Sequence, residues 1–391
     1  MSSLEANIAK LYIIKASKWF MLVMPIYALF YKDNNLSGSD LILLQAVYSI
    51  SIAFMEVPSG YAADVFGRKR TIVLGSILGV IGFVIYSIYS GFWFFLVAEL
   101  ILGLGQSFIS GSDSALLYDS LEQLKKKDKY LKYEGRITAL GGFAEMLAAL
   151  VGGLVAIEFS LRSVFFIQSM IAFMAVPAAL LLVEPFRENK LTGVKFKTLI
   201  DISKYALWKN KKLSSVILFS SVIGSATLAM AWLALVYYTD YIQLQEKEIT
   251  IVWIILNATV AIVSFYADTI KKKINNTFLI FSIALVIPLG YLFLGFANFL
   301  SSIVVLFVFY VVRGYATPLL KELINRQCPA EIRATVLSVR SLIIRLLFAI
   351  VGLFIGSAFA LWGVATSLAV CSIPLFVCVL ASLWYMRAQQ E

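Results

Sequence analysis

Three glutamates inside long apolar stretches are the residues of this sequence whose type and setting suggest chemistry. Glu56, Glu99 and Glu145 each have mainly apolar neighbours, and the chain contains no histidine. An apolar surrounding favours the neutral form of a carboxyl group, whereas a nearby cation favours its charged form. A carboxylate that alternates between these surroundings takes up and releases a proton. We therefore treat Glu56, Glu145 and Glu99 as candidates for proton coupling.

The elements that position these glutamates are membrane helices. The chain has 391 residues, of which 61% are hydrophobic and 14% are charged, and its mean hydropathy is +0.88. Apolar segments of about 20 residues recur along the whole length, which is typical of membrane-spanning helices rather than of the shorter strands of a membrane barrel. The sequence predicts an all-helical protein embedded in a lipid bilayer.

Twelve spans are predicted, in two groups of six. The first group covers residues 9–31, 40–62, 71–90, 93–117, 135–157 and 163–183. The second covers residues 213–239, 249–270, 276–297, 300–320, 333–357 and 361–386. The predicted domains are an N-terminal half (1–183), a cytoplasmic linker (184–212) and a C-terminal half (213–391), with an interfacial helix near Phe196 to Trp208 in the linker.

Lysine and arginine residues mark one side of the membrane. Alternate loops carry the cations, as at 68–70, 125–129, 209–212 and 271–273, and the intervening loops are neutral or acidic. This pattern predicts that both termini face the cytoplasm. We expect the protein to lie in the cell (inner) membrane. The net charge of +10 is explained by these loops, so no nucleic-acid partner is expected.

The sequence offers no conventional cofactor site. Its three cysteines, Cys328, Cys371 and Cys378, lack metal-ligand spacing, and the absence of histidine argues against a zinc or haem site. A Walker-type glycine loop is also missing, which makes direct use of ATP an unlikely source of energy. We expect no metal, no cofactor and no enzyme activity, and a protein that works as a monomer.

Two short patterns recur at nearly the same offset. Residues 61–64 (YAAD) return as 265–268 (FYAD), which places Asp64 opposite Asp268 at an offset of 204 residues. Residues 115–119 (ALLYD) return as 318–322 (PLLKE), at an offset of 203 residues. The shared offset predicts that the two six-helix halves are related by an internal duplication.

A charged turn joins the second and third spans. It contains Gly60, Asp64, Gly67, Arg68 and Lys69. A glycine permits a tight turn, and a carboxylate near the membrane boundary accepts from an arginine or from an exposed helix N-terminus. These residues predict a conformational latch, whereas a purely topological basic loop would need only the cations.

These residues resemble the loop motif G-x-x-x-D-x-x-G-R-[KR] of the major facilitator superfamily, in particular of its drug/proton antiporters. The resemblance implies two six-helix halves around a central cavity that opens alternately to each side. It also implies that Asp64 meets the N-terminus of the eleventh span, near Arg333 to Thr335. Asp113, Asp119 and Asp268 are further latch candidates, the first two expected in a charge cluster with Arg68 or Arg136.

The sequence departs from drug exporters of this family in two places. The fourth span has Glu99 near the place where they carry an arginine, so coupling has to depend on carboxylates. The fifth span has Gly141–Gly142 and Gly152–Gly153 but no Gly-Pro pair. For Glu99 a structural role is equally open, and for Glu56 the alternative to proton coupling is a permanent ion pair with Arg340 or Arg345.

Residues that line the substrate cavity are expected on several spans. Lys18, Arg340 and Arg345 are cations at membrane depth, where a charge costs about 2.5–3.5 kcal/mol. The remaining candidates are aromatic or amide side chains: Tyr27, Tyr48, Trp232, Tyr237, Trp253 and Asn257.

The sequence therefore predicts a secondary active transporter that moves a small organic solute by alternating access, with proton-coupled efflux of amphipathic compounds as the first interpretation. A transporter of an anionic metabolite and a lysolipid or lipid flippase are the alternatives within transport. A membrane receptor or scaffold that does not transport is the alternative from another class.

Overall fold

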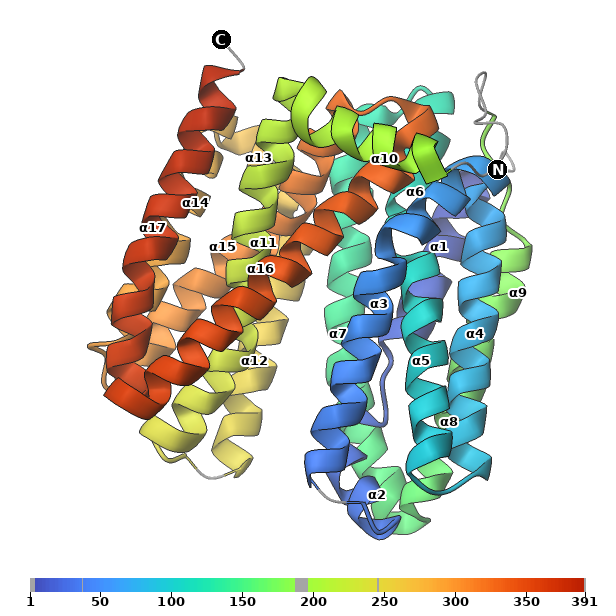
Figure 1. Ribbon diagram of the computed structural model, residues 1–391, viewed down its shortest axis with the longest axis vertical. Coiled ribbons are helices and arrows are strands. Elements are labelled where there is room, and N and C mark those ends of the chain that lie inside the picture. Colours follow the sequence, from blue (N-terminus) through green and yellow to red (C-terminus); the bar gives the residue numbers. More distant parts are fainter. Residues whose placement is uncertain (1–3, 37, 187–195, 245, 390–391) are drawn as a thin grey trace. The chain divides into compact units, whose positions relative to one another are not determined.

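The computed structural model describes residues 4–36, 38–186, 196–244 and 246–389 (Figure 1). Within these ranges the secondary structure is helical and contains no strand. The predicted all-helical fold is confirmed, and the twelve predicted spans fall mainly on helical segments.

Length and hydropathy identify most of these helices as membrane spans. Nine segments of the described chain are long and apolar enough to cross a membrane, or ten if Ile251–Phe265 and Ala267–Lys273, which meet at 60°, form one span. The first predicted span, residues 9–31, is divided between two helices. The break lies beside Pro25, which has no N–H to continue a helical ladder.

The chain folds as two compact units, each of which contains two separate segments of the sequence. Unit 1 contains Met1–Ser203 and also Cys328–Val339, and unit 2 contains Lys204–Gln327 and Arg340–Glu391. The long helix α16 (Arg333–Trp362) therefore begins in unit 1 and continues in unit 2. Part of the predicted linker, residues 187–195, lies outside the described residues.

Unit 1 is a bundle in which long helices pack lengthwise (Figure 1). α5 packs against both α3 and α4, α4 also packs against α8, and α1 packs against α7. The elements of this unit are α1 (Glu5–Trp19), η1 (Met24–Ile26), α2 (Tyr27–Asp33), α3 (Gly38–Phe66), α4 (Arg68–Ile88), α5 (Phe92–Ile109), α6 (Ser112–Gln123), η2 (Lys127–Lys129), α7 (Tyr130–Glu158), α8 (Leu161–Phe173), α9 (Ala175–Leu180), α10 (Phe196–Lys204) and η5 (Ala330–Ile332).

Unit 2 has its own helical packing. α14 lies against α15 and α17, α12 against α15, and α11 against α17. The elements of this unit, besides most of α16, are η3 (Tyr205–Lys209), α11 (Lys211–Val236), η4 (Tyr237–Tyr241), α12 (Glu246–Phe265), α13 (Ala267–Lys273), α14 (Asn276–Leu294), α15 (Phe299–Gln327) and α17 (Val364–Ala388).

A single glycine connects α3 to α4. Gly67 has φ of 104°, a left-handed backbone conformation that side chains disfavour, and α4 begins at the next residue. The sharp turn brings the charged end of α3 beside the first turn of α4. Asp64 and Arg68 consequently lie one helical turn apart in sequence yet belong to different helices.

Candidate functional site

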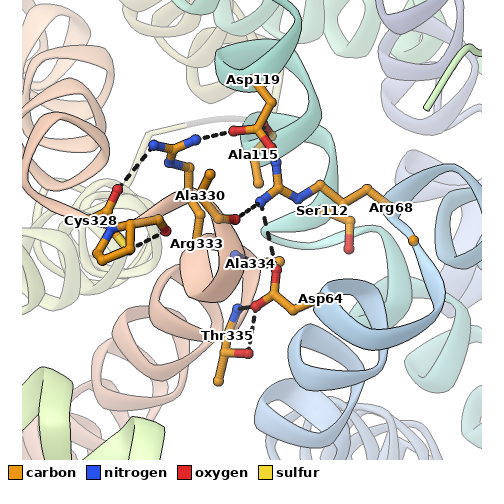
Figure 2. A network of polar contacts seen from close by, with 12 residues as sticks. Asp64, Arg68, Ser112, Ala115, Asp119, Cys328, Ala330, Arg333, Ala334 and Thr335 are labelled. Atoms are coloured by element: carbon orange, nitrogen blue, oxygen red, sulfur yellow. Dashed lines mark hydrogen bonds and ion pairs between the residues drawn. The ribbon is translucent and has the colours of Figure 1, made fainter. Parts of the chain in front are cut away.

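The carboxylate of Asp64 caps the start of α16. Thr335 donates its backbone N–H and its hydroxyl to Asp64 Oδ2 at 2.8 and 2.7 Å, and the N–H of Ala334 donates to Oδ1 at 3.3 Å (Figure 2). The first N–H groups of a helix have no partner within the helix, and the helix dipole favours an anion beside them. Asp64 is fully buried, so this contact is closed to water.

A second buried carboxylate, Asp119 on α6, joins two arginines. Arg68 Nη1 donates to Asp119 Oδ2, and Arg333 Nη1 donates to Asp119 Oδ1 (Figure 2). Arg68 also lies 3.6 Å from Asp64 Oδ1 and donates to the carbonyls of Ala115 and Ala330 at 2.8 and 2.6 Å. These side chains are at most 4% exposed, and the two carboxylates neutralise the two guanidinium groups.

The outer contacts of Arg333 complete this network. Its Nη2 donates to the carbonyl of Cys328 at 2.9 Å, and its guanidinium carbon lies 4.2 Å from the ring centroid of Tyr118. Burial raises the pKa of the Cys328 thiol to about 12, so the thiol stays protonated at neutral pH and adds no charge. We call Asp64, Arg68, Asp119, Arg333 and Thr335 the latch network.

Glu184 supports the latch network from a third segment. Its carboxylate accepts from the N–H of Arg68 at 2.9 Å and from the N–H of Lys69 at 2.7 Å, and so caps the start of α4. A Cβ on Gly67 would lie 3.1–3.3 Å from this carboxylate. Lys69 therefore contributes to this cap through its backbone N–H. The sequence gives no local signal for Glu184, which lies more than 100 residues away.

Gly60 allows α3 to approach the first turns of α16. A Cβ at this position would lie 2.4 Å from the hydroxyl oxygen of Ser338 and 2.9 Å from the carbonyl oxygen of Ala334. Such distances are far below van der Waals contact, so any side chain at this position forces the helices apart. The loop motif thus places two glycines for two reasons, a close approach at Gly60 and a turn at Gly67.

Unit 2 repeats part of this arrangement at the positions that the internal duplication indicates. Asp268 pairs with Lys272 at 2.7 Å, as Asp64 pairs with Arg68, each pair four residues apart. Glu322, at the position that matches Asp119, accepts from Lys271 at 2.7 Å and from Arg326 at 2.9 Å. The cations here are more exposed, since Lys272 is 72% exposed and Arg68 is fully buried.

Asp113 and Lys18 line a small pocket in unit 1. The pocket lies among α1, the end of α5, α6 and α7, and its charged lining also includes Lys15 and Glu134. Ser114 on its wall lies 2.6 Å from the hydroxyl of Tyr130. Two ammonium and two carboxyl groups line this hollow together with leucine and isoleucine side chains.

Four side chains with hydrogen-bond donors surround the carboxylate of Glu99 in unit 1. The donors are Tyr86 at 2.6 Å, Gln45 at 3.0 Å, Tyr27 at 3.3 Å and Tyr31 at 3.5 Å. Glu99 is 2% exposed. Tyr27, predicted to face the cavity, thus directs its hydroxyl at a carboxylate, and a pair of tyrosines four residues apart on α2 is the sequence signal that could have indicated this.

The other two coupling candidates lie in different surroundings. Glu56 on α3 is fully buried, and Glu145 on α7 is half-buried. Tyr48, a predicted cavity residue on the same helix as Glu56, is half-buried as well. The three glutamates come from three helices, α3, α5 and α7, of one unit.

The cavity candidates of unit 2 differ in their contacts. Arg340 donates from Nε to the hydroxyl of Ser220 at 2.5 Å, and Tyr237 donates to the carbonyl of Ala297 at 2.9 Å. Asn257 donates to the carbonyl of Trp253 on its own helix at 2.9 Å, while Trp253 and Arg345 are half-buried. The side chain of Trp232 lies outside the described part of the chain.

Sequence reasoning missed Arg313, an arginine near the middle of the 29-residue helix α15. Its guanidinium carbon lies 5.1 Å from the ring centroid of Tyr310. No described carboxylate forms an ion pair with it. The signal was present, because Arg313 interrupts an apolar run between Phe299 and Tyr315.

This chain is similar to a known protein family and to solved structures of transporters. The family model described as Major Facilitator Superfamily matches residues 16–352. The solved structure of the transporter FucP covers 100% of both chains with a TM-score of 0.79 at 13% identity, and the human organic anion transporter MFSD10 covers 98% of both with a TM-score of 0.72 at 14% identity. At such identities these structures show the fold alone.

Among curated relatives, the Quinolone resistance protein NorA of Staphylococcus aureus is 23% identical over 230 residues, 59% of this chain and 57% of NorA. The Multidrug resistance protein MdtG of Escherichia coli is 26% identical over 301 residues, 72% of this chain and 71% of MdtG. The family model spans most of the chain, and the helices follow the same fold. The chain therefore belongs to the Major Facilitator Superfamily, a family of transporters.

Proposed function

We propose that this protein is a proton-coupled secondary transporter that exports small amphipathic compounds across the cell membrane by alternating access. The observation that carries the proposal is the latch network, in which Asp64 caps α16 and Asp119 joins Arg68 to Arg333. The charges of such a buried cluster compensate one another in one arrangement of the helices, and this compensation is lost when the helices separate. A transporter that alternates between states uses such a contact as its latch.

The resemblance to multidrug resistance proteins supports efflux as the direction, and the positive loops support cytoplasmic termini in the inner membrane. Proton coupling is supported by Glu56, Glu99 and Glu145, since a histidine-free chain has to use carboxylates for this purpose. We expect the protein to work as a monomer in the bilayer.

The proposal is tested in proteoliposomes that contain the purified protein and a fluorescent amphipathic compound. We expect an imposed pH gradient to drive its movement in wild type, and this movement to be largely lost in Glu56→Gln and Glu145→Gln while binding of the compound persists. Glu158→Gln, which changes an exposed glutamate at the end of α7, is the matched control. Equal transport with and without the gradient in wild type would refute proton coupling.

A second candidate function, transport of an organic anion, rests on Arg313. This cation lies near the middle of α15 and is not paired with a described carboxylate. A guanidinium at membrane depth is costly unless an anion or a ring compensates it. The same liposomes loaded with aromatic carboxylates distinguish the two functions, because an anion transporter would prefer them and would lose this preference in Arg313→Gln.

A further inference from the structure

The surroundings of Glu99 form a hydrogen-bond chain whose donors can be assigned. Tyr86 lies 2.6 Å from Glu99 Oε1 and 2.6 Å from the hydroxyl of Tyr31. A phenol has one proton to donate. Because Tyr86 donates to the carboxylate, Tyr31 donates to Tyr86, and the longer contact of 3.5 Å between Tyr31 and Glu99 is secondary. Gln45 and Tyr27 donate directly.

All of these donors reach the same oxygen. The hydrogen bonds from described residues end on Oε1 of Glu99, and none of them ends on Oε2. A proton added at Oε2 therefore breaks none of these hydrogen bonds. The group can change its charge without rearrangement of its donors, which is what a reversible proton-binding site requires.

Among the described residues, aromatic rings form the wider shell of Glu99. Phe30, Phe95 and Phe165 pack around Tyr86, whose ring centroid lies 4.7 Å from that of Phe95 and 5.0 Å from that of Phe165. No described lysine or arginine forms an ion pair with Glu99. The nearby cation of α8, Arg162, donates to Asn34, to Ser90 and to the carbonyls of Ser87 and Tyr89, and lies over the ring of Phe30.

Two opposing effects therefore act on Glu99. Burial among rings favours the neutral acid, and the donors favour the carboxylate. The titratable groups that face it are Tyr27 and Tyr31 from α2 and Tyr86 from α4, with Tyr48 of α3 beside Tyr27. The tyrosines stay neutral donors at physiological pH, so Glu99 is the member of this cluster that changes charge.

We infer that Glu99 is a proton-binding site of this transporter, with Oε2 as the atom that takes up the proton. The hydrogen bonds to Oε1 weaken when the carboxylate becomes an acid, because bonds to a charged acceptor are roughly twice as strong as bonds to a neutral one. These bonds tie α2, α3 and α4 to α5, so protonation loosens four helices of unit 1 at one point. The inference deepens the proposed function and rests on it for its meaning in transport.

The test measures protonation directly, without substrate and without a gradient. Infrared difference spectra between acidic and alkaline pH are recorded on the purified full chain in lipid nanodiscs. Wild type is expected to show the carbonyl band of a buried protonated carboxyl group, and Glu99→Gln to lose that component. Glu158→Gln is the control and is expected to keep it. An unchanged band in Glu99→Gln would overturn the inference.

A second variant keeps the test decisive if Glu99→Gln fails to fold. Tyr86→Phe removes the shortest hydrogen bond to the carbonyl oxygen, so the band is expected to remain and to move to higher wavenumber. Tyr89→Phe, which changes an exposed tyrosine near the end of the same helix, is expected to leave it in place. If the carbonyl band keeps its wavenumber in Tyr86→Phe, the assignment to Glu99 is refuted. Absence of gradient-driven transport in wild type would instead refute the proposed function. The infrared test of Glu99 does not depend on that result.

Discussion

At the scale of single residues, the latch network depends on opposite charges that are buried together. Asp119 faces Arg68 and Arg333, and all three side chains are excluded from water. Breaking such a group by removal of one partner is costly, because the remaining charges stay buried without compensation. Surface ion pairs behave differently, since water screens their charges. The exposed Lys126, for example, donates to Glu5, which raises the pKa of this lysine without any such burial.

We therefore expect Asp119→Asn to destabilise the protein by about 3–5 kcal/mol. The substitution removes the carboxylate that joins the two buried guanidinium groups, which leaves Arg68 with Asp64 at 3.6 Å and Arg333 with the more exposed Glu122 at 3.9 Å. Thermal unfolding of the detergent-solubilised protein measures the effect as a lower midpoint temperature. Asp128→Asn, which alters an exposed carboxylate in η2, is expected to leave the midpoint nearly unchanged. Equal midpoints for the two variants would show that the network contributes little.

At the scale of elements, close packing between helices decides which glycines are irreplaceable. Gly60 on α3 is in contact with the first turns of α16, whereas Gly79 on α4 has nothing within 4 Å of a Cβ built on it. The two positions lie in helices, so an alanine meets the same backbone conformation at both. Only the space around the added methyl group differs.

The same substitution should therefore have opposite effects at these two sites. Gly60→Ala is expected to destabilise by about 1–3 kcal/mol through overpacking against Ser338 and Ala334. Gly79→Ala is expected to stabilise by about 0.5–1 kcal/mol, because alanine loses less conformational freedom in a helix than glycine does. Chemical or thermal unfolding of both variants against wild type checks the prediction, which fails if Gly60→Ala is as stable as Gly79→Ala.

The sequence predicted the elements better than the partners. Hydropathy located the twelve helical segments, and the spacing of Gly60, Asp64 and Gly67 predicted a charged turn with a helix N-terminus as its counterpart. Glu184 and most donors of Glu99 were not predicted, because hydrogen bonds between residues 54 to 116 positions apart depend on which helices pack together. Hydropathy alone does not determine that packing.

At the scale of the whole molecule, the two repeated sequence patterns lie in two similar clusters of unequal burial. Asp64 is fully buried and contacts α16, while the matching Asp268 pairs mainly with the exposed Lys272. Equivalent positions in sequence therefore do not carry equal energies. The proposed latch belongs to the buried cluster.

We expect Asp64→Asn to change the balance of inward-open and outward-open states. Asparagine cannot accept at both oxygens, so the contacts to Ala334 and Thr335 are weakened. Distances between spin labels, one in each unit, report the populations, and the matched variant Asp268→Asn is expected to change them much less. Identical distance distributions for wild type and Asp64→Asn would mean that Asp64 is not a latch.

The division of the chain into units also has a consequence for biosynthesis. Asp64 is synthesised before its partner Thr335, which is 271 residues later in the chain, and Asp119 before its partner Arg333, which is 214 residues later. At roughly 5–20 residues per second, the ribosome needs on the order of tens of seconds to supply these partners. The contacts that tie Asp64 and Asp119 to the start of α16 therefore form only after residue 335 has been synthesised.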